Sequence, residues 1–144
     1  KKFIPKEDKY FMVTYGDGVS NVNIRDLVRF AKKQKTIGTI TGVHPGTSRY
    51  GLLSVDKKNI ATAFEEKPMI KESVNGGFMV FDKKIFNYIN EGELEHEALR
   101  RLIKINQLSV FPHDGFWHCM DTYKDVESLN KLWAENPEWR VWQE

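Results

Sequence analysis

The sequence predicts an α/β fold, and three stretches near its start carry that prediction. The uninterrupted apolar run Phe11–Val13 leads into Gly16–Gly18, as a buried central strand of an α/β sheet does where it leaves the core. A helix is predicted from the N-cap Asn23 to Lys35, with apolar residues at helical spacing and lysines in its last turn. The β-branched stretch Thr36–Val43 predicts the next strand, so the three elements form a right-handed βαβ unit with parallel strands.

The middle of the chain predicts an antiparallel insertion, which follows a polar loop over His44–Arg49. Tyr50–Val55 and Ile60–Glu65 have the composition of short strands, and Asp56–Asn59 has that of the turn between them. Pro68 ends the second strand, because proline has no N–H to donate to a ladder.

The second half of the chain continues the alternation of strands and helices. A strand is predicted over Val74–Phe81, a short helix around Ile85–Ile89, a longer helix from about Glu93 to Asn106, and a last strand over Leu108–Pro112. The longer helix is expected to bury Leu94, Leu99, Leu102 and Ile103.

A terminal helix and an aromatic tail complete the chain. Thr122 and Asp125 have the spacing of a capping box at the start of that helix. Its buried face is predicted to contain Val126, Leu129, Leu132 and Trp133. Trp139 and Trp142 follow it, and we expect both to pack on the domain or on a partner, because exposed tryptophans are costly.

Length and composition exclude several classes of protein. With 144 residues, 40% of them hydrophobic, the chain is one domain or a piece of a larger one. A net charge of +2 without a basic stripe argues against nucleic-acid binding. The single cysteine, Cys119, excludes an internal disulfide and favours the cytoplasm, and no apolar run approaches the roughly 18 residues of a membrane span. Because the chain begins with Lys1 rather than methionine, we expect that it has been cut or processed upstream.

Two aspartates are candidate metal ligands. Asp17 and Asp121 each follow an apolar stretch and precede a turn or a helix start. Carboxylate oxygens brought together from separate elements can hold Mg²⁺, which usually takes one or two carboxylates together with substrate phosphates. The alternatives are an ordinary Asp-Gly turn at Asp17 and a simple capping role for Asp121.

Glu66 and Lys67 are candidate substrate ligands at the end of a predicted strand. Neighbouring strand residues face opposite ways, so one side chain could accept hydrogen bonds from substrate hydroxyls while the other contacts a phosphate. Two solvated charges at a turn are the alternative. Gly51 and Asn75–Gly77 could leave bare backbone for a ligand, although turn glycines are commoner.

Other kinds of active site lack their sequence patterns. His113, His118 and Cys119 have no zinc-ligand spacing. The G-x-S-x-G elbow of the Ser/His/Asp hydrolases, the Walker A loop and the dinucleotide fingerprint do not occur in this sequence.

Taken in order, these stretches resemble the sugar-1-phosphate nucleotidyltransferases, and most closely the glucose-1-phosphate cytidylyltransferases. The residues that carry the resemblance are Thr14–Val19, Arg49–Gly51, Phe64–Pro68, Asn75–Phe78, His113–Trp117 and Met120–Thr122. The resemblance covers nearly the whole chain. It implies that residues 1–144 are the C-terminal portion of a Rossmann-like nucleotidyltransferase domain, with a mixed, mainly parallel sheet and flanking helices.

The resemblance also implies roles for individual residues. Asp17 and Asp121 would bind the catalytic Mg²⁺, and Lys67 would bind the phosphate of the sugar 1-phosphate. Glu66 would hold the sugar hydroxyls. The substrate-binding set would also include Tyr50, Gly51, Asn75 and Gly76. The implied reaction is attack of glucose 1-phosphate on the α-phosphorus of CTP, giving CDP-glucose and pyrophosphate, a transfer that depends on positioning and charge neutralisation.

Two departures from the family pattern limit this interpretation. Close relatives usually have Gln-Pro where this chain has His118-Cys119, so the loop beside Asp121 is expected to differ in shape. The family's glycine-rich nucleotide loop containing Gly-Thr-Arg is missing, and Gly46–Arg49 is too late in the chain to replace it. We therefore expect this chain to carry the sugar-phosphate and metal side of the site and to be inactive alone.

Two rival functions stay open. One is a related uridylyl- or thymidylyltransferase, and the other is a non-catalytic module that binds sugar phosphate. For the whole protein, the resemblance implies a cytoplasmic homo-oligomer without membrane or nucleic-acid partners. It also implies a role in making dideoxy-sugar, lipopolysaccharide or O-antigen precursors.

Overall fold

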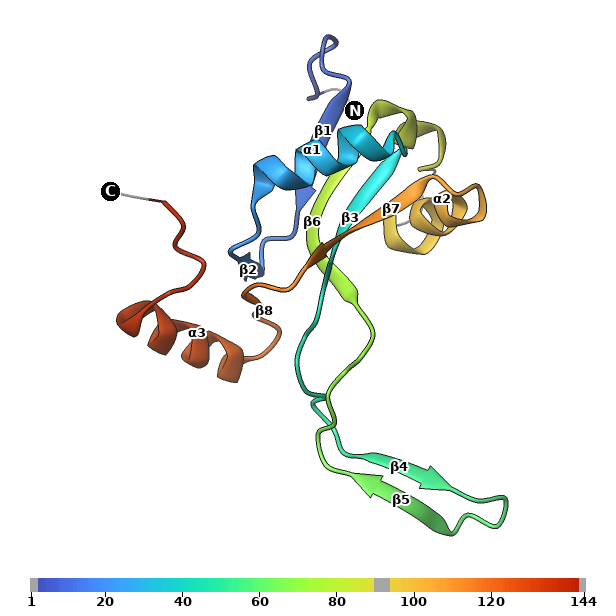
Figure 1. Cartoon of the computed structure of the whole chain (residues 1–144), viewed down its shortest axis with the longest axis vertical. Helices are drawn as coiled ribbons and strands as arrows, with labels where there is room; N and C mark the ends of the chain where they lie inside the picture. Colours follow the sequence, from blue (N-terminus) through green and yellow to red (C-terminus); the bar gives the residue numbers. More distant parts are fainter. Residues whose placement is uncertain (1–2, 90–93, 143–144) are drawn as a thin grey trace.

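The computed structural model describes residues 3–89 and 94–142 and confirms the α/β class (Figure 1). The main sheet has four strands in the order β1 (Tyr10–Thr14), β6 (Val74–Asp82), β3 (Gly38–Val43) and β7 (Leu108–His113). β7 pairs parallel with β3, whereas β6 pairs antiparallel with both β1 and β3. Only β6 therefore runs against the other strands of this sheet. The sheet is mixed as expected, with two antiparallel pairings and one parallel pairing.

The prediction that Phe11–Val13 lies in a central strand is wrong, because β1 forms an edge of this sheet. β6 separates β1 from β3, so the predicted βαβ unit has parallel strands that are not neighbours. The ring of Phe11 stacks on Phe86 with the centroids 5.3 Å apart, while Met12 is 44% exposed. The apolar character of this strand reflects the helices that cover Phe11 and Val13. It does not report whether the strand is central or at an edge.

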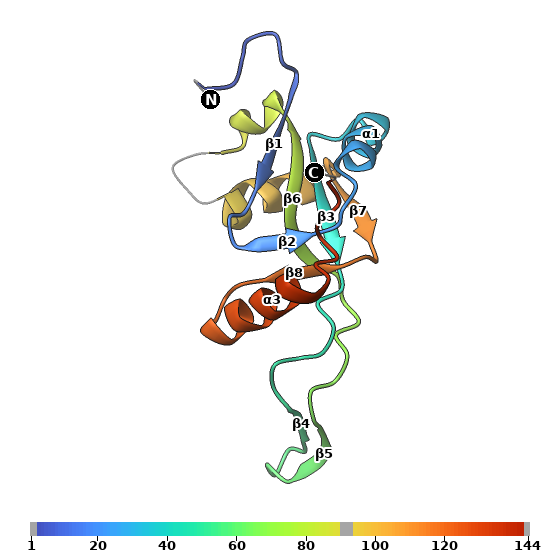
Figure 2. The same cartoon turned by 90° about the vertical axis from the view of Figure 1, so that its left-hand side faces the viewer.

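Helices cover both faces of the sheet (Figure 2). They are α1 (Ile24–Gln34), the 3₁₀-helix η1 (Lys83–Asn87), the π-helical turn η2 (Leu94–Leu99) and α2 (Arg100–Lys104). Leu27 and Ala31 of α1 pack on Val80, whereas Met79 and Phe81 pack against the layer formed by η1, η2 and α2. Successive residues of β6 therefore anchor two cores, one on each face of the sheet.

The long helix predicted from Glu93 to Asn106 is shorter and less regular than expected. Glu93 lies outside the described residues, and the described part is a π-helical turn followed by five α-helical residues. Leu99 and Leu102 are buried as predicted, but Ile103 is 58% exposed. The prediction for Ile103 is wrong, because a residue directly after the buried Leu102 points about 100° away from it on a helix.

The predicted insertion is a hairpin that projects away from the body of the molecule (Figure 1). Its strands are β4 (Leu52–Val55) and β5 (Ala61–Glu65), and every residue of both strands is exposed. The turn follows the prediction, since the Asp56 carboxylate accepts hydrogen bonds from the backbone N–H groups of Lys58 and Ile60.

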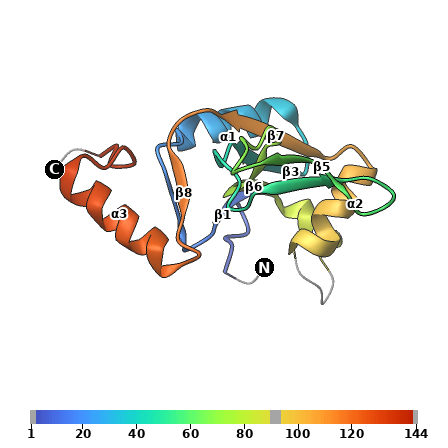
Figure 3. The ribbon, with the colours of Figure 1, turned by 90° about the horizontal axis from the view of Figure 1, so that it is seen from below.

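Two further strands, which the sequence did not predict, connect the sheet to the C-terminal region. β2 (Gly18–Ser20) pairs antiparallel with β8 (Trp117–Cys119), and α3 (Tyr123–Glu135) follows β8. Seen from below, α3 lies beside the sheet and on neither of its faces (Figure 3). The predicted capping box between Thr122 and Asp125 is present.

The aromatic tail packs partly on α3. Trp139 stacks on Phe116 with ring centroids 5.2 Å apart, and Trp133 contacts both Trp139 and Trp142. Leu129 of α3 is buried, but Trp133 is 51% exposed, so its assignment to the buried face is wrong. No helix within the described ranges is long and apolar enough to cross a membrane.

Candidate active site

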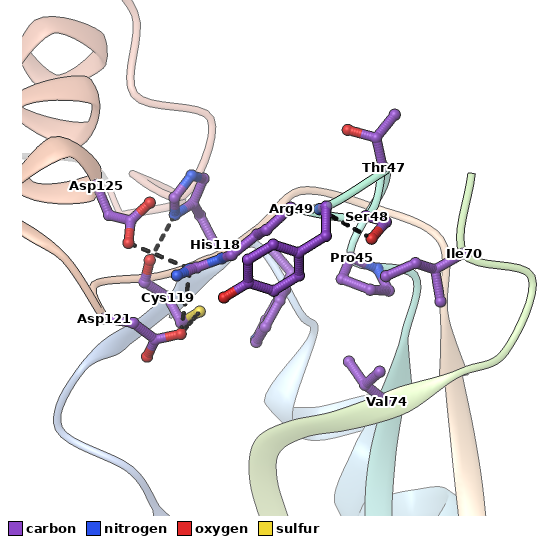
Figure 4. A pocket seen from close by; sticks show the side chains of 12 residues that line it. Pro45, Thr47, Ser48, Arg49, Ile70, Val74, His118, Cys119, Asp121 and Asp125 are labelled. Atoms are coloured by element: carbon purple, nitrogen blue, oxygen red, sulfur yellow. Dashed lines mark hydrogen bonds and ion pairs between the residues drawn. The ribbon is translucent and has the colours of Figure 1, made fainter. Parts of the chain in front are cut away.

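A cavity of about 520 Å³ lies where the loop after β3, strand β8 and the start of α3 meet. The loop contributes Arg49 and Tyr50, β8 contributes His118 and Cys119, and the segment at the start of α3 contributes Asp121. Figure 4 shows these elements converging, with the Arg49 side chain reaching toward the carboxylates. The site therefore depends on segments that are distant in the sequence.

Asp121 lies at the centre of the polar contacts in this cavity. Its Oδ2 accepts hydrogen bonds from Arg49 Nη2 at 3.1 Å and from Cys119 Sγ at 3.4 Å. Burial, followed by the hydrogen bond to Asp121, raises the pKa of the Cys119 thiol. Cys119 consequently acts here as a neutral donor, and Arg49 supplies the positive charge that faces the carboxylate.

Asp125 is a second carboxylate in contact with the same guanidinium. Its Oδ2 accepts from Arg49 Nη2 at 3.2 Å and from both the N–H and the hydroxyl of Thr122, each at 2.8 Å. The hydrogen bond from the Thr122 side chain, helped by Arg49, holds the pKa of Asp125 below its ordinary value. Asp125 is thus both the capping-box partner of Thr122 and a wall of the cavity.

Asp17 approaches Asp121 through the backbone. The register of β2 and β8 pairs Gly18 with Cys119, and the Met120 N–H donates to the Asp17 carbonyl at 2.8 Å. This pairing places Asp17 opposite the residue that precedes Asp121, although the side chain of Asp17 does not line the cavity. A Cβ added at Gly16 would meet nothing within 4 Å, so packing within the described chain does not explain that glycine.

Lys67 lies in an adjoining cavity of about 440 Å³. Arg49, His118 and Asp125 line both cavities, and Lys124 of α3 also lines the second. Lys67 has a φ of 47°, which a residue with a side chain rarely adopts. The structure thus places Lys67 next to the cavity of Asp121 without bringing the two side chains into the same one.

Apart from Tyr50, the predicted sugar-side residues lie in two groups outside the first cavity. Gly51 faces Glu66 at the base of the hairpin, where an added Cβ would lie 2.8 Å from Glu66 Oε2. Asn75 donates to the Tyr15 hydroxyl at 3.2 Å, and its Oδ1 accepts from the Gly77 N–H. Of the predicted substrate-binding residues, only Tyr50 lines the same cavity as Asp121.

Close packing accounts for the glycines beside Asn75. A Cβ at Gly76 would lie 2.7 Å from Val43 Cγ1, and Gly77 has a φ of +79°. Trp117 Nε1 donates to the Gly76 carbonyl at 2.8 Å, which ties β8 to β6.

Tyr15 has little tendency to ionise beside this cluster. It donates to the Glu95 carboxylate as well as accepting from Asn75. Burial first, and then the hydrogen bond to Glu95, raise the pKa of Tyr15 to about 12. Tyr15 is therefore a neutral hydrogen-bonding group near Asp17 at ordinary pH.

The donor set around Asp121 suits a hard cation that keeps other ligands. Within residues 3–89 and 94–142, no three His, Cys, Asp or Glu side chains gather as a metal cluster would. His113 contacts the Ser20 hydroxyl and His118 contacts the Cys119 carbonyl, which are structural partners. Asp17, directly before β2, and Asp121, two residues after β8, are the carboxylates that could hold Mg²⁺, since Mg²⁺ retains waters and takes oxygens from substrate phosphates. The guanidinium on Asp121 shows that this carboxylate already attracts a cation.

Arg49 contacts both carboxylates of this cavity, yet the sequence assigned it no role. It occurs in the motif Arg49–Gly51, in which roles were predicted for Tyr50 and Gly51 alone. Its contacts with Asp121 and Asp125 join positions more than 70 residues apart, and no local pattern reveals such a pairing.

Comparisons with known proteins agree with this description. The family described as "Nucleotidyl transferase" matches residues 1–140. The chain is 37% identical over 139 residues to the "Probable glucose-1-phosphate cytidylyltransferase" of Bacillus subtilis, covering 94% of this chain and 54% of that protein. It is 33% identical over 142 residues to the glucose-1-phosphate cytidylyltransferase of Salmonella typhi, covering 96% of this chain and 54% of the relative.

A solved structure supports the fold. HddC from Yersinia pseudotuberculosis superposes with a TM-score of 0.61 at 20% identity, over 88% of this chain and 56% of that one. The chain therefore spans about half the length of the relatives that it matches.

Proposed function

The chain belongs to the nucleotidyl transferase family, and on that premise we propose that the whole protein transfers a cytidylyl group from CTP to glucose 1-phosphate. The products would be CDP-glucose and pyrophosphate. The observation that carries the choice of substrates is the 33–37% identity to glucose-1-phosphate cytidylyltransferases over nearly all of this chain. The adjoining cavities of Asp121 and Lys67 support it, because they offer carboxylates and a cation for a phosphorylated substrate.

Lys67 would bind the phosphate of glucose 1-phosphate, and Glu66 would accept hydrogen bonds from the sugar hydroxyls. Tyr50, Gly51, Asn75 and Gly76 would line the sugar side. Held in this way, a phosphate oxygen of glucose 1-phosphate attacks the α-phosphorus of CTP in line, the new P–O bond forms, and pyrophosphate leaves. No protein nucleophile is required, so the residues contribute positioning and charge neutralisation.

Asp17 and Asp121 would hold Mg²⁺. When bound, the ion would neutralise charge that develops on the phosphoryl oxygens of the triphosphate. The two aspartates would position the Mg²⁺ ion and keep it beside the phosphate of the sugar. Lys67, in the adjoining cavity, would supply further positive charge for the phosphate.

This chain would supply the sugar-phosphate and metal side of the site, and a further segment of the whole protein would supply the nucleotide loop. Within the described residues β1 pairs on one side only, with β6, and this supports the division. Cavities of about 450 and 200 Å³ lie beside β1, and Met12 lines both of them. An unpaired edge with apolar side chains next to it suits the addition of another strand.

A transferase for UTP or dTTP is the nearest alternative, because base selection would belong to the other segment. A non-catalytic sugar-phosphate module is the second alternative. We place the whole protein in the cytoplasm as a homo-oligomer in nucleotide-sugar synthesis, on the resemblance alone.

The test is a comparison of this chain with a longer protein that adds the missing segment. Each is incubated with glucose 1-phosphate, Mg²⁺ and either CTP, UTP or dTTP, and nucleotide-sugar formation is measured. We expect CDP-glucose from the longer protein only, with a loss of at least roughly a hundredfold in Asp121→Ala and Lys67→Ala. CDP-glucose from this chain alone would disprove the division, and a preference for UTP or dTTP would favour the first alternative.

A further inference from the structure

Arg49 occupies the position at which a cation would meet Asp121. Its Nη2 lies 3.1 Å from Asp121 Oδ2 and 3.2 Å from Asp125 Oδ2, so one nitrogen serves both carboxylates. Figure 4 shows the guanidinium between the two acids, with the Cys119 sulfur beside it. Any divalent cation that binds Asp121 through this oxygen must compete with Arg49.

The ion pair between Arg49 and Asp121 is weak enough for another cation to replace Arg49. The side chains of Arg49 and Asp121 are 48% and 53% exposed, and ion pairs this open contribute little net stability. Asp125 keeps two hydrogen bonds from Thr122 if Arg49 leaves, so the start of α3 does not depend on the guanidinium. The departure of Arg49 would therefore leave no buried charge unpaired.

Hydrogen bonds hold the backbone on both sides of Arg49, while its side chain can rotate into the adjoining cavity. Ser48 N–H donates to the Pro68 carbonyl at 2.7 Å and Ile70 N–H donates to the Gly46 carbonyl at 2.9 Å, which hold the loop against the other connection of the hairpin. Arg49 also lines the adjoining cavity that contains Lys67 and Lys124. A rotation of the side chain alone would move the positive charge from the carboxylates toward that cavity.

We propose that Arg49 is an exchangeable counter-ion, which neutralises Asp121 and Asp125 until a divalent cation binds and then contacts the phosphate of the substrate in the cavity of Lys67. This inference rests on the proposed function, because it takes Asp121 as a cation ligand. It adds a coupling between the two cavities: the arrival of the cation frees a phosphate-binding group. Cation and sugar phosphate should consequently strengthen each other's binding.

The first experiment measures Mn²⁺ binding to this chain by electron paramagnetic resonance at about 0.15 M salt, where charges that do not contact Asp121 are largely screened. Arg49→Gln should bind Mn²⁺ roughly three- to tenfold more tightly than the parent, because the competing cation is gone. Lys124→Gln removes an equal charge near the same site without touching Asp121, and Arg29→Gln breaks the exposed pair with Asp26 on the distant α1. Both controls should change Mn²⁺ affinity by less than about twofold.

The second experiment measures glucose 1-phosphate binding by calorimetry with and without Mn²⁺. In the parent, Mn²⁺ should tighten glucose 1-phosphate binding severalfold, whereas in Arg49→Gln that enhancement should be lost. Equal Mn²⁺ affinity in the parent and Arg49→Gln would overturn the exchange, as would an equal gain in Lys124→Gln. Asp121→Asn separates the two claims: if it binds Mn²⁺ like the parent, the metal assignment itself fails. If it loses Mn²⁺ while Arg49→Gln matches the parent, only the exchange fails.

Discussion

The sheet and the hairpin represent opposite extremes of burial in this molecule. Met79 and Phe81 of β6 are at most 1% exposed, whereas every residue of β4 and β5 is exposed. The candidate site lies between these extremes, where the loops leave the sheet and meet β8 and α3. The two-layered core stabilises the fold, whereas Arg49 and Asp121, whose side chains are about half exposed, are less constrained by packing.

The strongest test of this contrast compares two phenylalanines. Phe81→Ala should lower the free energy of unfolding by about 3–5 kcal/mol, because it opens a cavity in the core beside Phe11. Phe64→Ala on the hairpin should change it by less than about 0.5 kcal/mol, since Phe64 is 64% exposed. Urea denaturation followed by circular dichroism measures both, and similar losses would mean that the hairpin is packed in solution.

A second test compares two glycines. Gly76→Ala should cost about 1–3 kcal/mol, because the new methyl group would lie 2.7 Å from Val43 Cγ1 and 3.2 Å from the Thr41 carbonyl oxygen. Gly16→Ala has open space and should be neutral or stabilising by a few tenths of a kcal/mol. The melting temperatures of both variants, compared with the parent, measure these effects. An unchanged melting temperature in Gly76→Ala would contradict the tight packing of β6 on β3.

The cap of α3 should have an intermediate effect. Thr122→Ala removes the side chain that accepts from the Asp125 N–H and should lower the unfolding free energy by about 1 kcal/mol. Ser128→Ala, on the same helix beyond the first turn, is the matched control. If both variants melt alike, the capping box does not stabilise α3 measurably.

The smallest effect concerns pH. The pKa of Asp125 is held below its ordinary value of 3.8 by Thr122 first and also by Arg49 and His118. A depressed pKa means that the stabilisation is present above the unfolded-state value and is lost as pH falls through the folded-state value. The melting temperatures of the parent and Asp125→Asn should therefore differ at pH 6 and converge below about pH 4. A difference that stays constant down to pH 2.5 would exclude an ionised Asp125 as its source.

The sequence was a good guide to helix caps and turns, where the signal is local. The α1 cap at Asn23, the turn at Asp56 and the capping box at Thr122 all depend on neighbours within a few residues, and each was predicted correctly. Phe11 and Val13 of β1 pack against the core on one face, but side chains do not report backbone pairing, so the edge position of β1 was missed.

Ile103 and Trp133 were wrongly assigned to buried helix faces, because helical spacing overestimated the width of those faces. Contacts between distant segments account for the other misses. The three-residue strands β2 and β8 are too short to show a period, and only their pairing brings Asp17 toward Asp121. The sequence singled out both aspartates as candidates, yet it had no means of showing that Asp121 lines the cavity and Asp17 does not. Arg49 was missed for the same reason, since its partners are distant in the chain.

The bridge between Thr47 and Met69 has a consequence for the plasticity of this region. Together with the hydrogen bonds from Ser48 and Ile70, it clamps the two connections of the hairpin side by side before β4 begins. Because residues 52–55 and 61–65 beyond that clamp are fully on the surface, we expect changes in hairpin length to leave the register of β3 and β6 unaltered. Residues 52–65 are therefore a candidate grafting point for a new recognition element.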